Sequence, residues 1–437
     1  MQFKQRLMIV LLMSAIVLVG CAPTTSIVGT QENSQATATG NAAQPPRNIT
    51  LEFWNFADFA TGPGGELVQQ FIDEYEAANP GVTVELVGKP DTEIEAGVIA
   101  GASAGELPDV FANAYNSGYA VSNAGAVKDV SEWWDALPED YRSQFSLAAV
   151  EALQRDGKMY GVPYTLYSTV LYRNLTVLRE AGIDPDAEIK DWDDWMSQMQ
   201  KVSEAGYTAL PNYTLDGWLV LHYLGGVEGV QNGVENGKWT VTTEQLAKAY
   251  AFLKSARQYG TDISPFDASA TDLFITDKLA FYSMGPWANP TFAEAAANNA
   301  LDYDYVLIPG ETANHAGGVH GGEFLAITPG PHAEEAFKFA AFLADKTQMT
   351  RFAAALGRAN FNAAAMADPT VAENPLIKLT GESAAQGMND AAYFVPFPLS
   401  IRQPLSNYAI EAVEGRMSVE EAANGAIKEI NDILASD

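Results

Sequence analysis

Short segments with alternating apolar and polar residues are separated by longer segments with helical spacing. Residues 49–53 alternate in the way that is typical of a half-buried strand. After a loop rich in glycine and proline, residues 67–75 place their apolar side chains on one helical face, and residues 82–86 alternate again. This strand–helix–strand order predicts a βαβ unit with a largely parallel sheet, and therefore an α/β protein.

Further elements follow from local signals along the chain. The sequence at 109–111 predicts the next short strand. Asp191 can cap a helix, with Asp194 at its third position, and Ser418 with Glu421 forms a capping-box sequence before another helix. We expect strands and helices to alternate through most of the chain.

The N-terminus predicts a secretion signal. Lys4 and Arg6 precede an apolar run over residues 7–19, which is too short to span a membrane and fits a signal peptide. The run ends just before Cys21, the only cysteine of the chain, in a sequence that resembles the lipobox of bacterial lipoprotein precursors. We therefore expect residues 1–20 to be a lipoprotein signal peptide and Cys21 to carry the lipid.

The next segment predicts a tether. Residues 21–48 are rich in small and polar residues and have few large apolar side chains with which to build a core. This arrangement places the protein in the cell envelope, anchored by lipid to the outer face of the membrane, whether that face is periplasmic or extracellular.

Composition narrows the functional classes. The chain has 437 residues, with 25 Lys and Arg against 55 Asp and Glu, and a formal charge of −30. Such an acidic chain is a poor candidate for binding nucleic acid. A single cysteine excludes intrachain disulfides and cysteine-cluster metal sites. The length predicts two or three domains.

No motif for catalysis or metal binding has the context that its chemistry needs. A G-x-S-x-G sequence surrounds Ser103, but it follows a predicted helix and precedes a strand, which is the reverse of a nucleophile elbow. The acidic cluster at 191–194 favours a helix start over a glycosidase site. The four histidines lack metal-ligand spacing. The sequence therefore predicts no catalytic residue, no metal and no cofactor.

Aromatic residues gather in predicted loops, beside glycine, proline and small polar residues. They lie at 54–59, 115–119, 164–167, 216–218 and 285–287. Ligands of open α/β sheets bind at the carboxyl ends of strands, where such loops begin. Aromatic faces suit the C–H faces of a pyranose ring, and Asp, Asn and Arg suit its hydroxyl groups. This composition therefore predicts a sugar site.

A series of motifs along the body carries a family resemblance. The motifs are Leu51–Trp54, Gly105–Val110, Gly157–Tyr164, Asp191–Asp194, Lys278–Trp287 and Gly321–Ile327. In this order they resemble the family 1 extracellular solute-binding proteins of ABC transporters, which include maltose-binding protein and multiple-sugar-binding lipoproteins. The resemblance runs from about residue 49 to residue 433.

The resemblance implies an α/β fold of two lobes, the periplasmic-binding-protein fold of type II, with a hinge and a ligand cleft between the lobes. The N-terminal lobe would comprise residues 49–163 and 312–360, and the C-terminal lobe residues 164–311 and 361–437. In this family, ligand binding closes the hinge, and the closed form docks on permease subunits in the membrane.

The resemblance also implies a set of ligand contacts. Trp287 is the expected stacking residue, while Asp58, Asp216 and Arg402 would hydrogen-bond to hydroxyl groups. The expected contacts are Phe56, Asp58, Phe59, Asn113, Tyr115, Asn116, Tyr167, Asp216, Trp218, Trp287, His320, Glu323 and Arg402.

These features together lead to one hypothesis and several alternatives. The hypothesis is a monomeric, lipid-anchored component of an ABC importer that captures a carbohydrate, an oligosaccharide above all, and delivers it to a permease. In one alternative the same fold binds a polyamine or a phosphorylated polyol. Two others are a secreted polysaccharide hydrolase, and a sensor subunit that signals to a receptor.

Overall fold

The computed structural model describes residues 48–211, 217–230, 232–235, 238–389 and 399–436. All of them belong to one compact unit that begins at Pro46. The predicted signal peptide, the tether with Cys21 and the expected contact Asp216 lie outside the described residues. In the described part of the chain, no helix is both long enough and apolar enough to cross a membrane.

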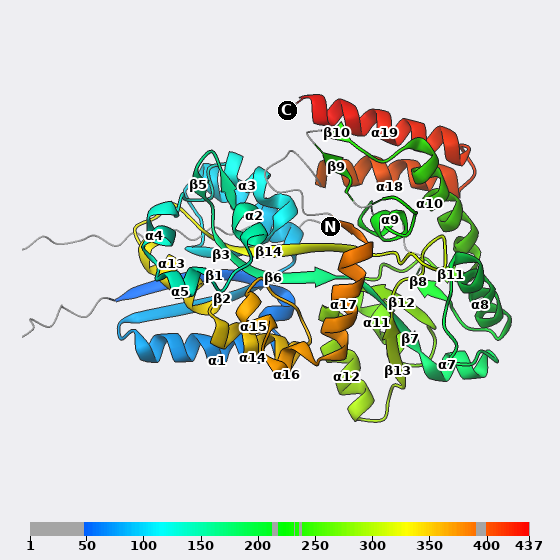
Figure 1. Ribbon diagram of the computed structural model, residues 1–437, viewed down its shortest axis with the longest axis horizontal. Helices are drawn as coiled ribbons and strands as arrows, with labels where there is room; N and C mark the ends of the chain where they lie inside the picture. The colour runs from blue at the N-terminus through cyan, green and yellow to red at the C-terminus, as the bar shows by residue number, and fades with distance from the viewer. Residues whose placement is uncertain (1–47, 212–216, 231, 236–237, 390–398, 437) are drawn as a thin grey trace, which may run out of the picture. The chain divides into compact units, whose positions relative to one another are not determined.

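The first sheet is built on the predicted βαβ unit. Strand β1 (Ile49–Phe56) pairs in parallel with β2 (Val82–Lys89), and helix α1 (Gly62–Ala78) connects them (Figure 1). The apolar face predicted for α1 is buried, with Phe71 and Ile72 fully enclosed. The predicted unit is therefore confirmed.

Four more strands extend this sheet. β3 (Val110–Ala114) lies parallel to β1, and β14 (Val319–Ile327) lies antiparallel to β3. Strands β6 (Val162–Ser168) and β15 (Met388–Asn389) both pair with β14. The sheet is parallel over β1, β2 and β3, as predicted, and becomes mixed where β14 joins it.

Helices and short strands complete this lobe, around a core that includes Phe53, Phe111 and Phe324. The additional elements are η1 (Ala57–Phe59), α2 (Asp91–Ala104), η2 (Tyr115–Ser117), α3 (Gly118–Asn123), α4 (Ser131–Ala136), α5 (Glu139–Arg142), α6 (Leu147–Glu151), β4 (Gln154–Arg155), β5 (Lys158–Met159), α13 (Ala333–Leu343), α14 (Lys346–Leu356), α15 (Ala363–Met366) and α16 (Pro369–Ala372).

The second lobe contains a smaller sheet and a large helical core. Strand β7 (Val170–Asn174) pairs antiparallel with β12 (Phe281–Met284) on one side and β13 (Tyr303–Val306) on the other. The other elements are α7 (Leu175–Glu180), α8 (Trp192–Glu204), β8 (Leu210–Pro211), α9 (Gly217–Leu224), β9 (Val234–Glu235), β10 (Lys238–Trp239), α10 (Thr243–Ala256), η3 (Arg257–Tyr259), β11 (Gly260–Thr261), α11 (Ala268–Ile275), η4 (Pro286–Ala288), α12 (Asn289–Ala297), α17 (Pro375–Gln386), α18 (Leu399–Val413) and α19 (Val419–Ser436). Helices α8, α9, α10, α18 and α19 share one hydrophobic cluster.

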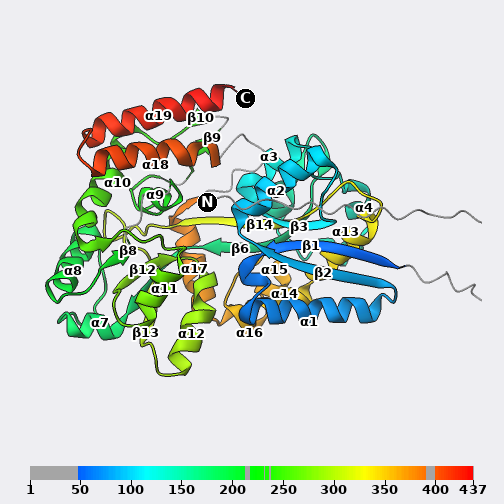
Figure 2. The same ribbon diagram turned by 180° about the vertical axis from the view of Figure 1, so that it is seen from behind.

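Strands β6 and β14 and helix α17 lie where the two lobes meet. β6 belongs to the first sheet and β7 to the second, and the fully buried Thr169 lies between them. Its hydroxyl accepts a hydrogen bond from the Val319 amide at 2.9 Å, and its carbonyl accepts one from the Ser383 hydroxyl of α17 at 2.8 Å. Figures 1 and 2 show β6 and β14 reaching from the first sheet to α17. The lobe boundaries given above stay a prediction.

Three local predictions are confirmed. Helix α2 ends at Gly105, whose φ of 76° is left-handed, so Ser103 lies in a helix C-terminal turn and not in a nucleophile elbow. The Asp191 carboxylate accepts a hydrogen bond from the Asp194 amide at 2.9 Å. Ser418 and Glu421 bond to each other's amides at 3.2 and 3.0 Å, as a capping box requires.

Candidate functional site

A cavity of about 540 Å³ lies between the two lobes, within the size range of small-molecule sites. The first lobe contributes the residues that follow β1, β2 and β3, because the carboxyl ends of parallel strands meet at one edge of the sheet. The second lobe contributes loops and the start of α9. The lining residues are Phe56, Ala57, Asp58, Lys89, Pro90, Asp91, Ala114, Asn116, Tyr167, Trp218, Ser264, Phe266, Trp287, Glu323, Arg358 and Arg402.

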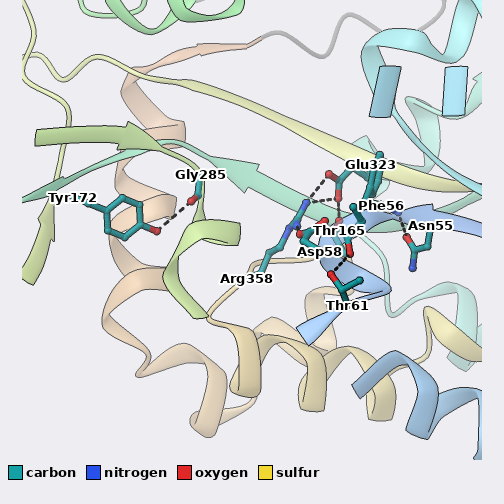
Figure 3. A network of polar contacts seen from close by, with 10 residues as sticks. Asn55, Phe56, Asp58, Thr61, Thr165, Tyr172, Gly285, Glu323 and Arg358 are labelled. Carbon is teal, nitrogen blue, oxygen red and sulfur yellow. Dashed lines mark hydrogen bonds and ion pairs between the residues drawn. The ribbon is translucent and has the colours of Figure 1, made fainter. Parts of the chain in front are cut away.

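Local hydrogen bonds shape the loop that carries Asp58. The Asn55 side chain, at the end of β1, accepts a bond from the Phe56 amide at 2.9 Å. The Thr61 hydroxyl donates to the Ala57 carbonyl at 2.8 Å and closes the loop before α1 begins. The loop therefore holds the Asp58 carboxylate at the cavity surface (Figure 3).

Arg358 joins two carboxylates at the base of the cavity. Its Nη1 donates to Asp58 Oδ2 at 2.9 Å, and its Nη2 donates to the two Glu323 oxygens at 2.6 and 2.7 Å (Figure 3). The Thr165 hydroxyl of β6 also donates to Glu323. Only 3% of the Arg358 side chain is exposed, so these charge-assisted bonds replace most of its hydration. Arg358 thereby has a fixed position.

Glu323 is a buried carboxyl group in this network. Burial raises its pKa to about 7, although the Arg358 guanidinium acts in the opposite direction. Glu323 also lies where the pairing of β14 with β6 shifts register between Gly322 and Phe324, which is typical of a β-bulge. The irregularity directs a charged side chain toward the cavity from an otherwise buried strand.

Aromatic rings lie on both sides of the guanidinium. The Arg358 Cζ lies 4.4 Å from the ring centre of Phe59 and 5.5 Å from that of Trp287, within the range of cation–π contacts. Gly285 makes room for this tryptophan, because a Cβ at Gly285 would lie 2.0 Å from the indole ring. The Gly285 carbonyl accepts a bond from the Tyr172 hydroxyl at 3.2 Å (Figure 3).

A row of four aromatic side chains lines the cavity from the hinge to the rim. Tyr167 lies 5.9 Å from Trp287, ring centre to ring centre, and Trp287 lies 6.0 Å from Trp218. Phe266 follows, 5.4 Å from Trp218, and 54% of its surface is exposed. The row presents flat apolar faces beside the charged groups at the base of the cavity.

The structure brings most of the expected contacts together, although they come from distant parts of the chain. Those that line the cavity are Phe56, Asp58, Asn116, Tyr167, Trp218, Trp287, Glu323 and Arg402. Whether each of them contacts a ligand stays a prediction. Asp216 lies outside the described residues.

Four expected contacts do not line this cavity. Phe59 is buried beneath Arg358 and lines a smaller neighbouring cavity, and Asn113 lies within β3, opposite Phe324 of β14. The Tyr115 ring stacks on Phe361, with 4.8 Å between ring centres, and is part of the first lobe's core. His320 lies within β14, where burial lowers its pKa to about 4. Asn113 and His320 lie in strands and Phe59 and Tyr115 in the short helices η1 and η2, and the sequence did not reveal which side each of them faces.

Among the cavity's charged and aromatic side chains, sequence reasoning missed four. Lys89 ends β2 and Asp91 begins α2, and the rule applied to the other strand ends would have found them. Phe266 follows Pro265 in a loop, which is the same aromatic signal that identified the other segments. Arg358 follows the left-handed Gly357 at the end of α14, and no sequence pattern marks it as part of a site.

Among the described residues, no group of three or more His, Cys, Asp or Glu side chains could hold a metal ion.

Comparison with known proteins identifies the family. A profile of the bacterial extracellular solute-binding protein family matches residues 70–379, more than half of the chain. The chain belongs to this family. Such proteins act outside the cytoplasm, and the two-lobe fold with its interlobe cavity agrees with this membership.

Two curated proteins that are similar to this chain are solute-binding proteins of Bacillus subtilis. The arabinooligosaccharide-binding protein is 24% identical over 212 residues, which cover 47% of this chain and 46% of the relative. The chain thus aligns with only about half the length of that relative. The maltodextrin-binding protein MdxE is 23% identical over 378 residues, which cover 84% of this chain and 87% of the relative.

A solved structure has a similar fold over most of this chain. The GacH receptor of Streptomyces glaucescens, which was crystallised without ligand and with acarbose, superposes with a TM-score of 0.77 at 20% sequence identity. The match covers 89% of this chain and 99% of the receptor. The predicted two-lobe α/β fold of periplasmic binding proteins is confirmed.

Proposed function

We propose that this solute-binding protein captures an oligosaccharide between its lobes and delivers it to the permease of an ABC importer. The observation that carries the proposal is the row formed by Tyr167, Trp287, Trp218 and Phe266, which lines the cavity together with hydrogen-bonding groups. A sugar chain has alternating apolar C–H faces and polar edges, and this cavity offers a partner for each.

The charge of the cavity supports a neutral ligand. Three acidic and three basic side chains line it, so neither sign is in excess. They are Asp58, Asp91, Glu323, Lys89, Arg358 and Arg402. A phosphorylated polyol would favour an excess of bases, and a polyamine an excess of acids. The names of the arabinooligosaccharide- and maltodextrin-binding relatives agree with a neutral sugar ligand.

The arrangement of the carboxyl groups favours binding over hydrolysis. A glycosidase needs two carboxyl groups on either side of the bond to be cleaved. Asp58 and Glu323 instead both bind the Arg358 guanidinium, which occupies their oxygens in an ion pair, and the matched family consists of solute-binding proteins. We therefore propose a binding protein without catalytic activity, cofactor or nucleic-acid partner.

The proposal also includes how the protein is attached to the membrane and how its lobes close on the ligand. Cleavage before Cys21 and lipidation of its sulfur would hold the protein at the outer face of the membrane, and residues 21–48 would allow it to reach the permease. The lobes, with boundaries near residues 163, 311 and 360, would close on the ligand, and a monomer would suffice for this task.

A thermal-shift screen tests the proposal. The protein from Gln44 onward keeps the whole compact unit, and the panel holds mono- and oligosaccharides, polyols, glycerol phosphates and polyamines. A ligand at 100 times its dissociation constant adds about 2.7 kcal/mol to the free energy of unfolding. We expect shifts with particular oligosaccharides only. A shift confined to phosphates or polyamines would overturn the carbohydrate assignment and leave the fold intact.

A further inference from the structure

A second cavity, of about 190 Å³, adjoins the first beyond the pair formed by Arg358 and Trp287. We propose that it is an additional subsite, which takes one further sugar unit of a longer oligosaccharide. The proposal rests on the function proposed above and concerns the length of the ligand.

The two cavities share a wall. Asp58, Trp287 and Arg358 line both of them, so the two cavities adjoin at these three residues. Arg358 is held by Asp58 and Glu323 and cannot readily leave this wall. Trp287 is only partly buried and lines both cavities. The second cavity therefore continues the first and has no separate centre of charge.

The lining of the second cavity has the mixed character of a sugar site. Three prolines, Pro63, Pro286 and Pro290, supply apolar surface, while Thr291 supplies a hydroxyl group and Asp58 a carboxylate. The volume is about one third of that of the first cavity, which suits the extension of a site better than a second independent ligand.

Both lobes contribute to this second cavity. The start of α1 forms one side, and η4 with the first turn of α12 forms the other. A sugar unit bound there would contact both lobes and would add to the free energy that favours the closed form. We thus expect affinity to rise with chain length until the second cavity is filled.

Substitution of Thr291 tests the subsite. Thr291 is exposed on α12 and lines the second cavity but not the first, so Thr291→Trp should fill the cavity without disturbing the core. Titration calorimetry with malto-, arabino-, galacto- and chito-oligosaccharides, from disaccharide to hexasaccharide, gives the affinity at each length. We expect an affinity loss of about tenfold for the longest ligand of the series that binds, and an unchanged affinity for the shortest.

A matched control and a graded variant complete the test. Ala293→Trp adds the same side chain on the same helix, at an exposed position that lines neither cavity, and should bind every length as the unaltered protein does. Thr291→Phe, which is smaller, should give an intermediate loss. Equal affinities of Thr291→Trp and the unaltered protein at all lengths would overturn the subsite, as would an equal loss at all lengths. If the unaltered protein binds no oligosaccharide, the proposed function itself fails, and this inference fails with it.

Discussion

Trp287 contacts side chains from the hinge, the second lobe and the first lobe. Its ring lies beside Tyr167, Trp218 and Arg358 and borders both cavities. Closure of the lobes around a ligand would move these neighbours relative to one another. It would therefore change the surroundings of the Trp287 ring.

Removal of the Trp287 ring should weaken ligand binding strongly. We expect Trp287→Ala to lower the binding free energy by roughly 2 kcal/mol or more, as loss of a central aromatic contact does at other interfaces. Calorimetry with the oligosaccharide found in the screen measures the change. Trp133→Ala is the control, because Trp133 packs on Phe337 in the first lobe and lines neither cavity. An unchanged affinity in Trp287→Ala would place the site elsewhere.

Loss of Arg358 should affect stability as well as binding. Arg358→Leu leaves the buried Glu323 without its charged partner; because the pKa of Glu323 is already raised to about 7, the carboxyl would take up a proton, and we expect a loss of unfolding free energy below the roughly 3–5 kcal/mol of a broken buried ion pair. Urea unfolding at neutral pH measures this loss. The double variant Arg358→Leu with Glu323→Leu removes both charges and should regain part of the stability. If the loss of unfolding free energy in the double variant equals the sum of the losses in the two single variants, the two side chains are not energetically coupled.

At the scale of elements, α9 carries a buried histidine next to the cavity. His222 lies one turn after Trp218, with 4.3 Å between ring centres, and is fully buried. Burial, together with the nearby positive charge of Arg402, lowers its pKa to about 3. The folded protein therefore keeps His222 neutral at pH values where the unfolded chain would protonate it.

This difference predicts the sign of a pH effect. Between about pH 6.5 and pH 3 the unfolded chain binds a proton at His222 that the folded protein does not, so stability falls as the pH is lowered, by up to about 1.4 kcal/mol per pH unit. In His222→Phe this contribution is absent. The difference in unfolding free energy between the two proteins, measured in urea from pH 7 to pH 4.5, isolates it from the titration of other groups such as Glu323 and His320. A difference that does not vary with pH would contradict the burial of a neutral His222.

Elements also show where sequence reasoning works and where it does not. β1, α1 and β2 follow directly from periodicity, because each buries one face against one neighbour. β14 is harder, because its residues 319–327 are almost all buried and no alternation separates its two faces. His320 and Glu323 lie three residues apart on this strand, yet only Glu323 reaches the cavity. Residues an odd number apart on a strand tend to face opposite sides, but in a strand buried on both faces the sequence does not tell which side borders the cavity.

At the scale of the whole molecule, the proposed function requires both the cavity between the lobes and the predicted attachment to the membrane. The lobes meet at the cavity, while the predicted anchor at Cys21 precedes the first strand by a tether of polar residues. If residues 21–48 form the predicted tether, the folded unit would be free to close and to meet the proposed permease, because such a tether would impose no fixed orientation.

The anchor can be tested directly. Cys21→Ser removes the only sulfur that a lipid could modify at this position, so the protein should move from the membrane fraction to the soluble envelope or medium fraction. Fractionation followed by immunoblotting measures this. Ser26→Ala, in the tether, is the control and should stay with the membrane. Membrane attachment that persists in Cys21→Ser would exclude the lipid anchor.

The sequence alone determined the class of this protein. Periodicity predicted the α/β body, the order of motifs indicated the solute-binding family, and aromatic loops at strand ends indicated where a ligand would bind, since all three depend on neighbours along the chain. Only the tertiary structure decided which side chains face the cavity. Arg358 meets Asp58, 300 residues earlier, and Trp287 meets Arg358 across the lobes, because folding brings distant elements together. Such contacts depend on register, burial and lobe position, which local patterns do not specify.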